Sequence, residues 1–155
     1  MVPTTCEYLQ IGHGGNAYIF NTSGEQLHKL VPNDPANEGY FGRSVGISGS
    51  TIVVGASGAQ KAYIFNTDGQ QLTQVGTYPG LFGFSVAISG STFVVGAFMG
   101  DSGNGATYIF NTDGQLLQKL TVPNVGSFPD RFWSSVGIEG STVVSGAMRD
   151  DYNGD

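Results

Sequence analysis

Short apolar runs separated by turn-forming residues set the pattern of this chain. Val, Ile, Phe and Tyr gather in runs of a few residues, and Gly, Ser, Asn and Asp stand between the runs. Runs that are short, rich in β-branched and aromatic residues and bounded by turn residues predict strands rather than helices. The expected fold class is therefore all-β.

Two sequence blocks recur along the chain. The block Tyr-Ile-Phe-Asn-Thr has a constant spacing of 45 residues and begins at Tyr18, Tyr63 and Tyr108. The block Ser-Val-x-Ile has spacings of 41 and 50 residues and begins at Ser44, Ser85 and Ser135. Loops tolerate changes of length better than strands do, so these differences predict insertions in the connections. The chain thus holds three copies of one unit.

Each unit is predicted to contain four strands. In the unit that is easiest to follow, the strands are expected at 44–47, 51–56, 62–66 and 71–75. Gly49-Ser50 and Asp68-Gly69 are signals for tight hairpin turns between them. The first three strands are apolar on both faces and the fourth is mixed, as expected for a covered sheet with an outer edge strand. Four strands repeating every ~40–45 residues predict β-propeller blades of four antiparallel strands, three repeats per chain.

The ends of two units carry a recognisable motif. Phe41-Gly42 is followed by Gly55-Ala56, and Phe82-Gly83 by Gly96-Ala97. From about Gly14 to the end, the chain resembles the FG-GAP repeat family of integrin-α-like β-propellers. The sequence of its repeats is similar to that of the bacterial and environmental branch of this family. The resemblance implies a propeller fold and an extracellular or cell-surface location. It says little about function, because one fold hosts many activities.

Two features depart from the family pattern. The third copy has Phe132-Trp133 where Phe-Gly is expected. The integrin-like calcium loop between the first two strands is reduced to a short turn such as Ser48-Gly49-Ser50. Calcium binding at that place is therefore not expected.

The position of the repeats along the chain predicts that two copies assemble. We treat 1–155 as a single propeller unit with repeat material over about 14–155, and with blades at about 44–76 and 85–121. The half-unit 135–147 and the half-unit 17–31 are complementary. Closing them within one chain gives three blades, whereas propellers have about 4–8. We therefore expect a head-to-tail homodimer that closes a six-bladed ring, 135–147 completing a blade with 17–31 of a second chain. The alternatives are an open filament and a segment of a longer propeller.

Composition excludes several partner classes. The net charge is −6, with only 6 Lys and Arg in 155 residues, so neither nucleic acid nor an anionic membrane surface is an expected partner. The 25 glycines and the 12% of charged residues do not fit a helical bundle, and the apolar content does not fit disorder. The first residues show no signal-peptide pattern.

One acidic segment could bind a metal ion. Asp151, Asn153 and Asp155 stand at alternate positions, which matches the first three oxygen ligands of a calcium loop. The alternative is a solvated turn rich in Asp, Asn and Gly. No cofactor is established by the sequence, and calcium is the candidate that this segment suggests.

Aromatic residues in the predicted loops are the candidate ligand-binding residues. They are Tyr40, Tyr78, Trp133 and Tyr152. Sugars stack on such rings, so a lectin-like function is an alternative to binding of protein or matrix ligands. Gly42-Arg43-Ser44-Val45-Gly46 matches a nucleophile elbow only by its letters, because a repeated strand follows Ser44 and no helix. We expect a non-catalytic binding or structural module and no enzyme activity.

Overall fold

A computed structural model describes residues 14–34, 39–100, 103–121 and 135–146. All of its regular elements are strands: within these residues there are twelve, arranged in four antiparallel sheets. The all-β prediction is confirmed. Among the residues described, no helix is long and apolar enough to span a bilayer.

Two sheets have four strands each and are simple meanders. The first has the order β3 (Phe41–Ser48), β4 (Thr51–Ala56), β5 (Lys61–Asn66) and β6 (Gln71–Gly76). The second has the order β7 (Phe82–Ser89), β8 (Thr92–Ala97), β9 (Ala106–Asn111) and β10 (Leu116–Leu120). Both follow the strand order expected from the repeats, although β3 and β7 begin earlier than expected, at the phenylalanine of each Phe-Gly pair.

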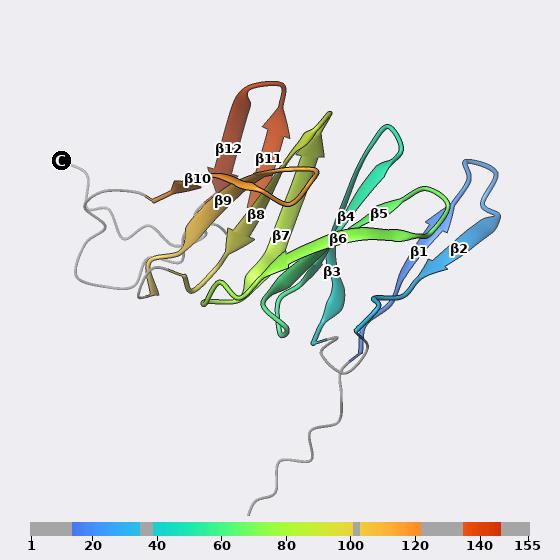
Figure 1. Cartoon of the computed structure of the whole chain (residues 1–155), viewed down its shortest axis with the longest axis horizontal. Helices are drawn as coiled ribbons and strands as arrows, with labels where there is room; N and C mark the ends of the chain where they lie inside the picture. Colours follow the sequence, from blue (N-terminus) through green and yellow to red (C-terminus); the bar gives the residue numbers. More distant parts are fainter. Residues whose placement is uncertain (1–13, 35–38, 101–102, 122–134, 147–155) are drawn as a thin grey trace, which may run out of the picture.

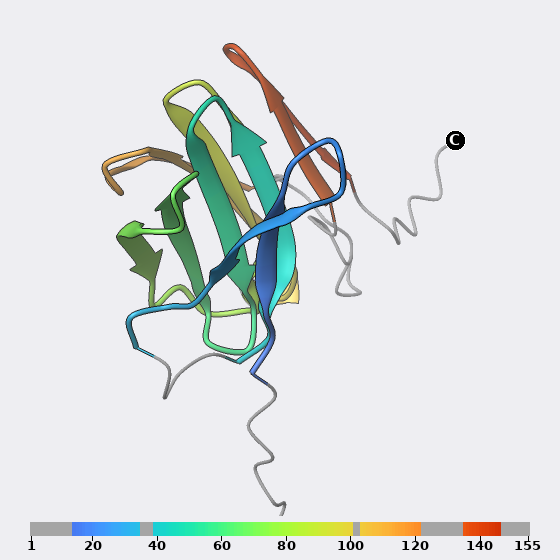
Figure 2. The same ribbon diagram turned by 90° about the vertical axis from the view of Figure 1, so that its right-hand side faces the viewer.

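The other two sheets have only two strands each. β1 (Ala17–Phe20) pairs with β2 (Gln26–Leu30), and β11 (Ser135–Glu139) pairs with β12 (Thr142–Gly146). These half-sheets lie at opposite ends of the row of sheets, with the two four-stranded sheets between them (Figure 1). The view along the row shows the successive sheets packed face to face (Figure 2).

An asparagine closes the hairpin between the third and fourth strand of each unit. The Asn66 side-chain oxygen accepts hydrogen bonds from the backbone N–H groups of Asp68 and Gln70, at 3.1 and 2.8 Å. Asn21 accepts both equivalent bonds, from the Ser23 and Glu25 N–H groups, and Asn111 accepts one from the Gln115 N–H. This Asx-type turn explains why Asn follows Tyr-Ile-Phe in every copy.

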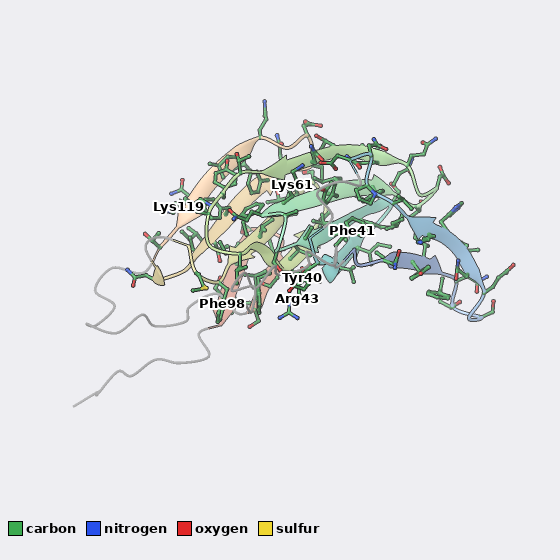
Figure 3. All side chains as sticks on the ribbon, turned by 90° about the horizontal axis from the view of Figure 1, so that it is seen from below. Tyr40, Phe41, Arg43, Lys61, Phe98 and Lys119 are labelled. Atoms are coloured by element: carbon green, nitrogen blue, oxygen red, sulfur yellow. The ribbon has the colours of Figure 1, made fainter. Side chains whose placement is uncertain are left out.

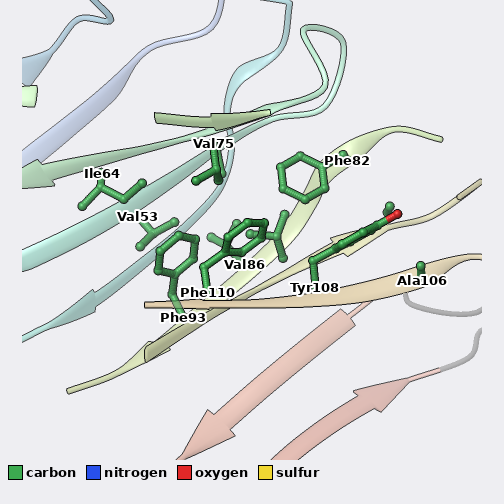
Figure 4. Close-up of a cluster of buried hydrophobic side chains, with 12 residues drawn as sticks. Val53, Ile64, Val75, Phe82, Val86, Phe93, Ala106, Tyr108 and Phe110 are labelled. Atoms are coloured by element: carbon green, nitrogen blue, oxygen red, sulfur yellow. The ribbon is translucent and has the colours of Figure 1, made fainter. Parts of the chain in front are cut away.

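The core lies between neighbouring sheets. One cluster fills the junction between the two four-stranded sheets, and Figure 4 shows its side chains interleaved from both sides. It is centred on Phe82, whose ring meets the edges of the Tyr108 and Phe110 rings at centroid distances of 5.4 and 6.0 Å. A second cluster joins the β1–β2 half-sheet to the first four-stranded sheet and is centred on Phe41 in the same way.

The glycine of each Phe-Gly pair allows the sheets to approach closely. Gly83 has φ +90°, and a Cβ atom there would lie 2.3 Å from the carbonyl oxygen of Lys61. Gly42 has φ +85°, and its Cβ would lie 2.4 Å from the carbonyl oxygen of Asn16. Both the positive φ and the backbone contact require glycine. The family-like motif is therefore a packing device between successive sheets.

Candidate functional site

An apolar groove opens beside the β1–β2 half-sheet. It has a volume of about 320 Å³ and lies between β1 and the exposed side of β3. Its walls are Ala17, Tyr18, Ile19, Phe20, Leu30, Val45, Gly46, Ile47 and Ile52. Val45 is 60% exposed and Ile47 is 62% exposed. The two residues stand two positions apart on β3, so their side chains lie on the same face of the strand and form one exposed apolar patch.

The opposite end of the row also presents an apolar residue. Val144 on β12 is 66% exposed, the highest value among the exposed large apolar residues of the described chain. Within the described residues, β12 pairs with β11 and with no other strand. Its neighbour Ser145 faces the preceding sheet, where its hydroxyl lies 3.0 Å from that of Thr107. β12 is thus anchored on one face and open on the other.

An ion pair ties the β1–β2 half-sheet to the next sheet. The Lys61 ammonium on β5 donates to the Asp34 carboxylate, which follows β2. Burial by itself raises the pKa of Asp34, but the hydrogen bonds from Lys61 and Tyr63 and the Lys61 charge outweigh it, so the pKa lies below its ordinary value. The Asn33 N–H also donates to the Gln71 side chain, at 2.8 Å. These contacts fix one wall of the groove.

Two of the four predicted aromatic ligand-binding residues, Tyr40 and Tyr78, lie within the described residues. Tyr40 precedes β3, has φ 58° and is 52% exposed. Tyr78 is partly buried, and its ring packs on those of Phe82 and Tyr108 at centroid distances of 5.0 and 4.6 Å. Trp133 and Tyr152 lie outside the described residues, as do the predicted calcium ligands Asp151, Asn153 and Asp155. In the part of the chain that the structure describes, no cluster of three or more His, Cys, Asp or Glu side chains could hold a metal ion.

One aromatic arrangement was not foreseen from the sequence. The Arg43 guanidinium lies over the Phe84 ring, 4.3 Å from its centroid, and Phe84 stacks on Phe98 with a centroid distance of 4.8 Å. Arg43 and Phe98 are labelled in Figure 3, which views the molecule from below. The signal in the sequence was weak, because Arg43 and Phe84 occupy equivalent positions of different repeats and meet only when the sheets stack.

Ser44, the serine of the apparent nucleophile elbow, takes part in sheet packing. Its hydroxyl donates a hydrogen bond to the carbonyl oxygen of Gly83 on the next sheet, at 3.2 Å. A Cβ atom on Gly55 would lie 2.4 Å from that hydroxyl, so the side chain is enclosed at the junction.

Comparison with solved structures finds similarity to two computationally designed proteins. The designed Ika4 protein is 14% identical, with a TM-score of 0.46, over 81% of this chain and 93% of that one. The designed Ika8 protein is 15% identical, with a TM-score of 0.37, over 81% of this chain and 47% of that one. A search of curated proteins finds no match.

Comparison with family sequence models finds the motif described above. The FG-GAP repeat model matches residues 25–69 and 80–110. These two segments include both Phe-Gly pairs, Phe41-Gly42 and Phe82-Gly83, together with the glycines that the close approach of the sheets requires. These two segments of the chain are therefore repeats of the FG-GAP family.

Proposed function

We propose that this chain is a non-catalytic binding and structural module, which joins a second copy in a six-bladed β-propeller and recognises ligands through the loops on its faces. The observation that supports this most strongly is the pair of half-sheets. β11–β12 corresponds to the first two strands of a unit and β1–β2 to the last two. Each half-sheet supplies what the other lacks.

The number of blades follows from closure. The row of sheets would become a ring if β12 of one copy lay beside β1 of another. One chain would supply three blades, and two chains supply six, which lies within the range of about 4–8 blades found in propellers. In such a ring the two head-to-tail junctions are equivalent and no half-sheet is left over. Repeat material over about 14–155 would then form one propeller unit per chain.

The solution mass tests the assembly. We expect light scattering to give twice the 16.2 kDa of the chain, constant over a hundredfold range of concentration. A monomer at all concentrations would overturn the proposal. Mass that keeps growing with concentration would show open head-to-tail filaments and would overturn the closed ring.

The proposed class of ligand rests on the location that the family resemblance implies and on one exposed aromatic residue. We propose a protein or matrix ligand, bound at an extracellular or cell-surface location, with the exposed Tyr40 as one contact. Binding of the dimer to immobilised matrix proteins, reduced at least ~10-fold by Tyr40→Ala, supports this. Binding to a glycan array without binding to any matrix protein would overturn it in favour of a lectin.

A further inference from the structure

The repeats provide an internal standard for the exposure of each position. Val45, Val86 and Val136 are equivalent, because they follow the serines that begin the repeated block. At the junction between the four-stranded sheets, Val86 on β7 is 8% exposed, whereas Val45 on β3 is 60% exposed. The two residues have the same place in the fold and the same chemistry. Among the described residues, the strands β3 and β4 that pack against β7 have no counterpart over β3, and Val45 is exposed there.

The covering residue can be identified from the filled junction. There Val86 shares a cluster with Val53 of β4 (Figure 4). Val53 is fully buried. The position equivalent to Val53 in the third unit is Val144 on β12, and it is 66% exposed. The cluster around Phe41 therefore lacks two members. Val45 lies beside the cluster but is exposed, and Val144, the equivalent of Val53, is exposed at the other end of the row.

We propose that Val144 of one copy fills the groove of a second copy between β1 and β3. This inference rests on the proposed ring and specifies its junction. β12 pairs antiparallel with β1 of the second copy, with Val144 opposite Ile19. The register is that of the complete sheets, in which Val53 lies opposite Ile64 and Val94 opposite Ile109. A shift by one residue would turn Val144 to the wrong face of the sheet, so burial of this side chain fixes the register.

A hydrogen bond at the turn between the first two strands of each unit supports the same junction between the two copies. At the described junctions, the Ser48 hydroxyl accepts from the Gly90 N–H at 3.0 Å, and the Ser89 hydroxyl accepts from the Gly140 N–H at 3.1 Å. The equivalent acceptor at the open end is Glu139. In the proposed junction its carboxylate accepts from the Gly49 N–H of the second copy, and such a charge-assisted bond is stronger than the neutral ones.

Exposure of apolar residues elsewhere follows a different rule. Leu27, Leu72 and Leu117 occupy one equivalent position on the fourth strand of each unit and are 47%, 57% and 52% exposed. Their exposure does not depend on whether a junction is filled. Tyr18 and Phe20 behave like Val144, because their equivalents Tyr63 and Phe65 are fully buried while they are 45% and 56% exposed. Val45, Tyr18, Phe20 and Val144 thus differ in exposure from their equivalents, whereas the three leucines do not.

A charge at Val144 tests the junction. We expect Val144→Arg to fold, because the side chain is exposed within one copy, and to raise the dissociation constant of the dimer at least ~100-fold. Leu72→Arg is the matched control and is expected to leave the dimer intact. A wild-type monomer would overturn the proposed ring itself. A wild-type dimer that tolerates Val144→Arg would leave a dimer but overturn this junction.

A disulfide tests the register. In a Cys6→Ser background, we expect the double variant Ile19→Cys with Val144→Cys to form an intermolecular disulfide on mild oxidation. The pair Ile19→Cys with Val143→Cys is the control, because Val143 lies on the opposite face of β12. Efficient cross-linking of the control pair, with none at Val144, would overturn the register even if both variants remain dimers.

Discussion

The filled junction between the two four-stranded sheets and the open junction at the β1–β2 half-sheet are built from equivalent residues. Phe82 is fully buried in the first and Phe41 is 1% exposed in the second. Val86 is buried in the first, whereas Val45 is exposed in the second. The phenylalanine is covered by strands from its own chain in both cases, and the valine is not. The difference therefore comes from missing neighbours and not from a change in the repeat.

The junction between neighbouring sheets is the unit that stabilises this fold. A sheet with apolar residues on both faces cannot bury them alone, so each sheet depends on the next, as in other repeat proteins. The aromatic contacts are denser at the filled junction, where Tyr78 packs on Phe82, Tyr108 and Phe110. At the open junction, Phe41 meets Tyr63 and Phe65. Truncation of these rings should show how much each junction contributes.

The largest effect is expected from Phe82→Ala. Removing a ring that is fully buried among three aromatic neighbours should lower the free energy of unfolding by ~3–5 kcal/mol, measured by urea denaturation. Phe41→Ala should cost less, by at least ~1 kcal/mol, because the open groove beside it lets side chains relax. Equal losses at the two sites, measured below the concentration at which the dimer forms, would contradict the comparison.

A smaller effect is expected from the glycine that follows Phe82. Gly83→Ala should cost ~2–3 kcal/mol, since alanine is strained at φ +90° and its Cβ would collide with the carbonyl of Lys61. The control is Gly90→Ala, at φ +57° with no atom within 4 Å of the added Cβ, which should cost only ~1 kcal/mol. Thermal unfolding of the two variants measures the difference. If Gly90→Ala costs as much as Gly83→Ala, the close approach of the sheets has no energetic role.

Local signals predicted the strands because each is encoded within a few residues. The apolar runs and the Asp68-Gly69 turn led to β5 and β6 with boundaries within one residue of those observed. The start of β3 was predicted three residues too late. Phe41 pairs with Ala56, but a bulge separates that pair from the pair of Ser44 with Gly55, and the run of apolar residues does not reveal it.

Contacts between sheets were harder to predict, because they depend on how successive units stack. Tyr78 was interpreted as a loop residue, yet its ring packs on the side chains around Phe82. The groove beside β1 has no motif of its own, since Val45 and the buried Val86 stand in the same repeated block, Ser-Val-x-Ile. Only the observed exposures distinguish the two positions.

The smallest effect is expected at the ion pair that joins the half-sheet to its neighbour. The filled junction has no equivalent, because the positions that match Asp34 and Lys61 are Pro79 and Ala106. A folded-state pKa of Asp34 below 3.8 means that its carboxylate stabilises the fold above about pH 4 and loses this contribution as the pH falls through the lowered value. Asp34→Asn should therefore lower the free energy of unfolding by ~0.5–1 kcal/mol at pH 7, since the ion pair is partly exposed. The difference in this free energy between the variant and the wild type should become smaller below pH 3.8. Urea denaturation across this range measures the difference, with the exposed Asp68→Asn as a control for the change of charge. A difference that stays constant with pH would mean that Asp34 acts through packing and not through its charge. The open junction would then be joined to the fold by the same kind of apolar contacts as the filled junction.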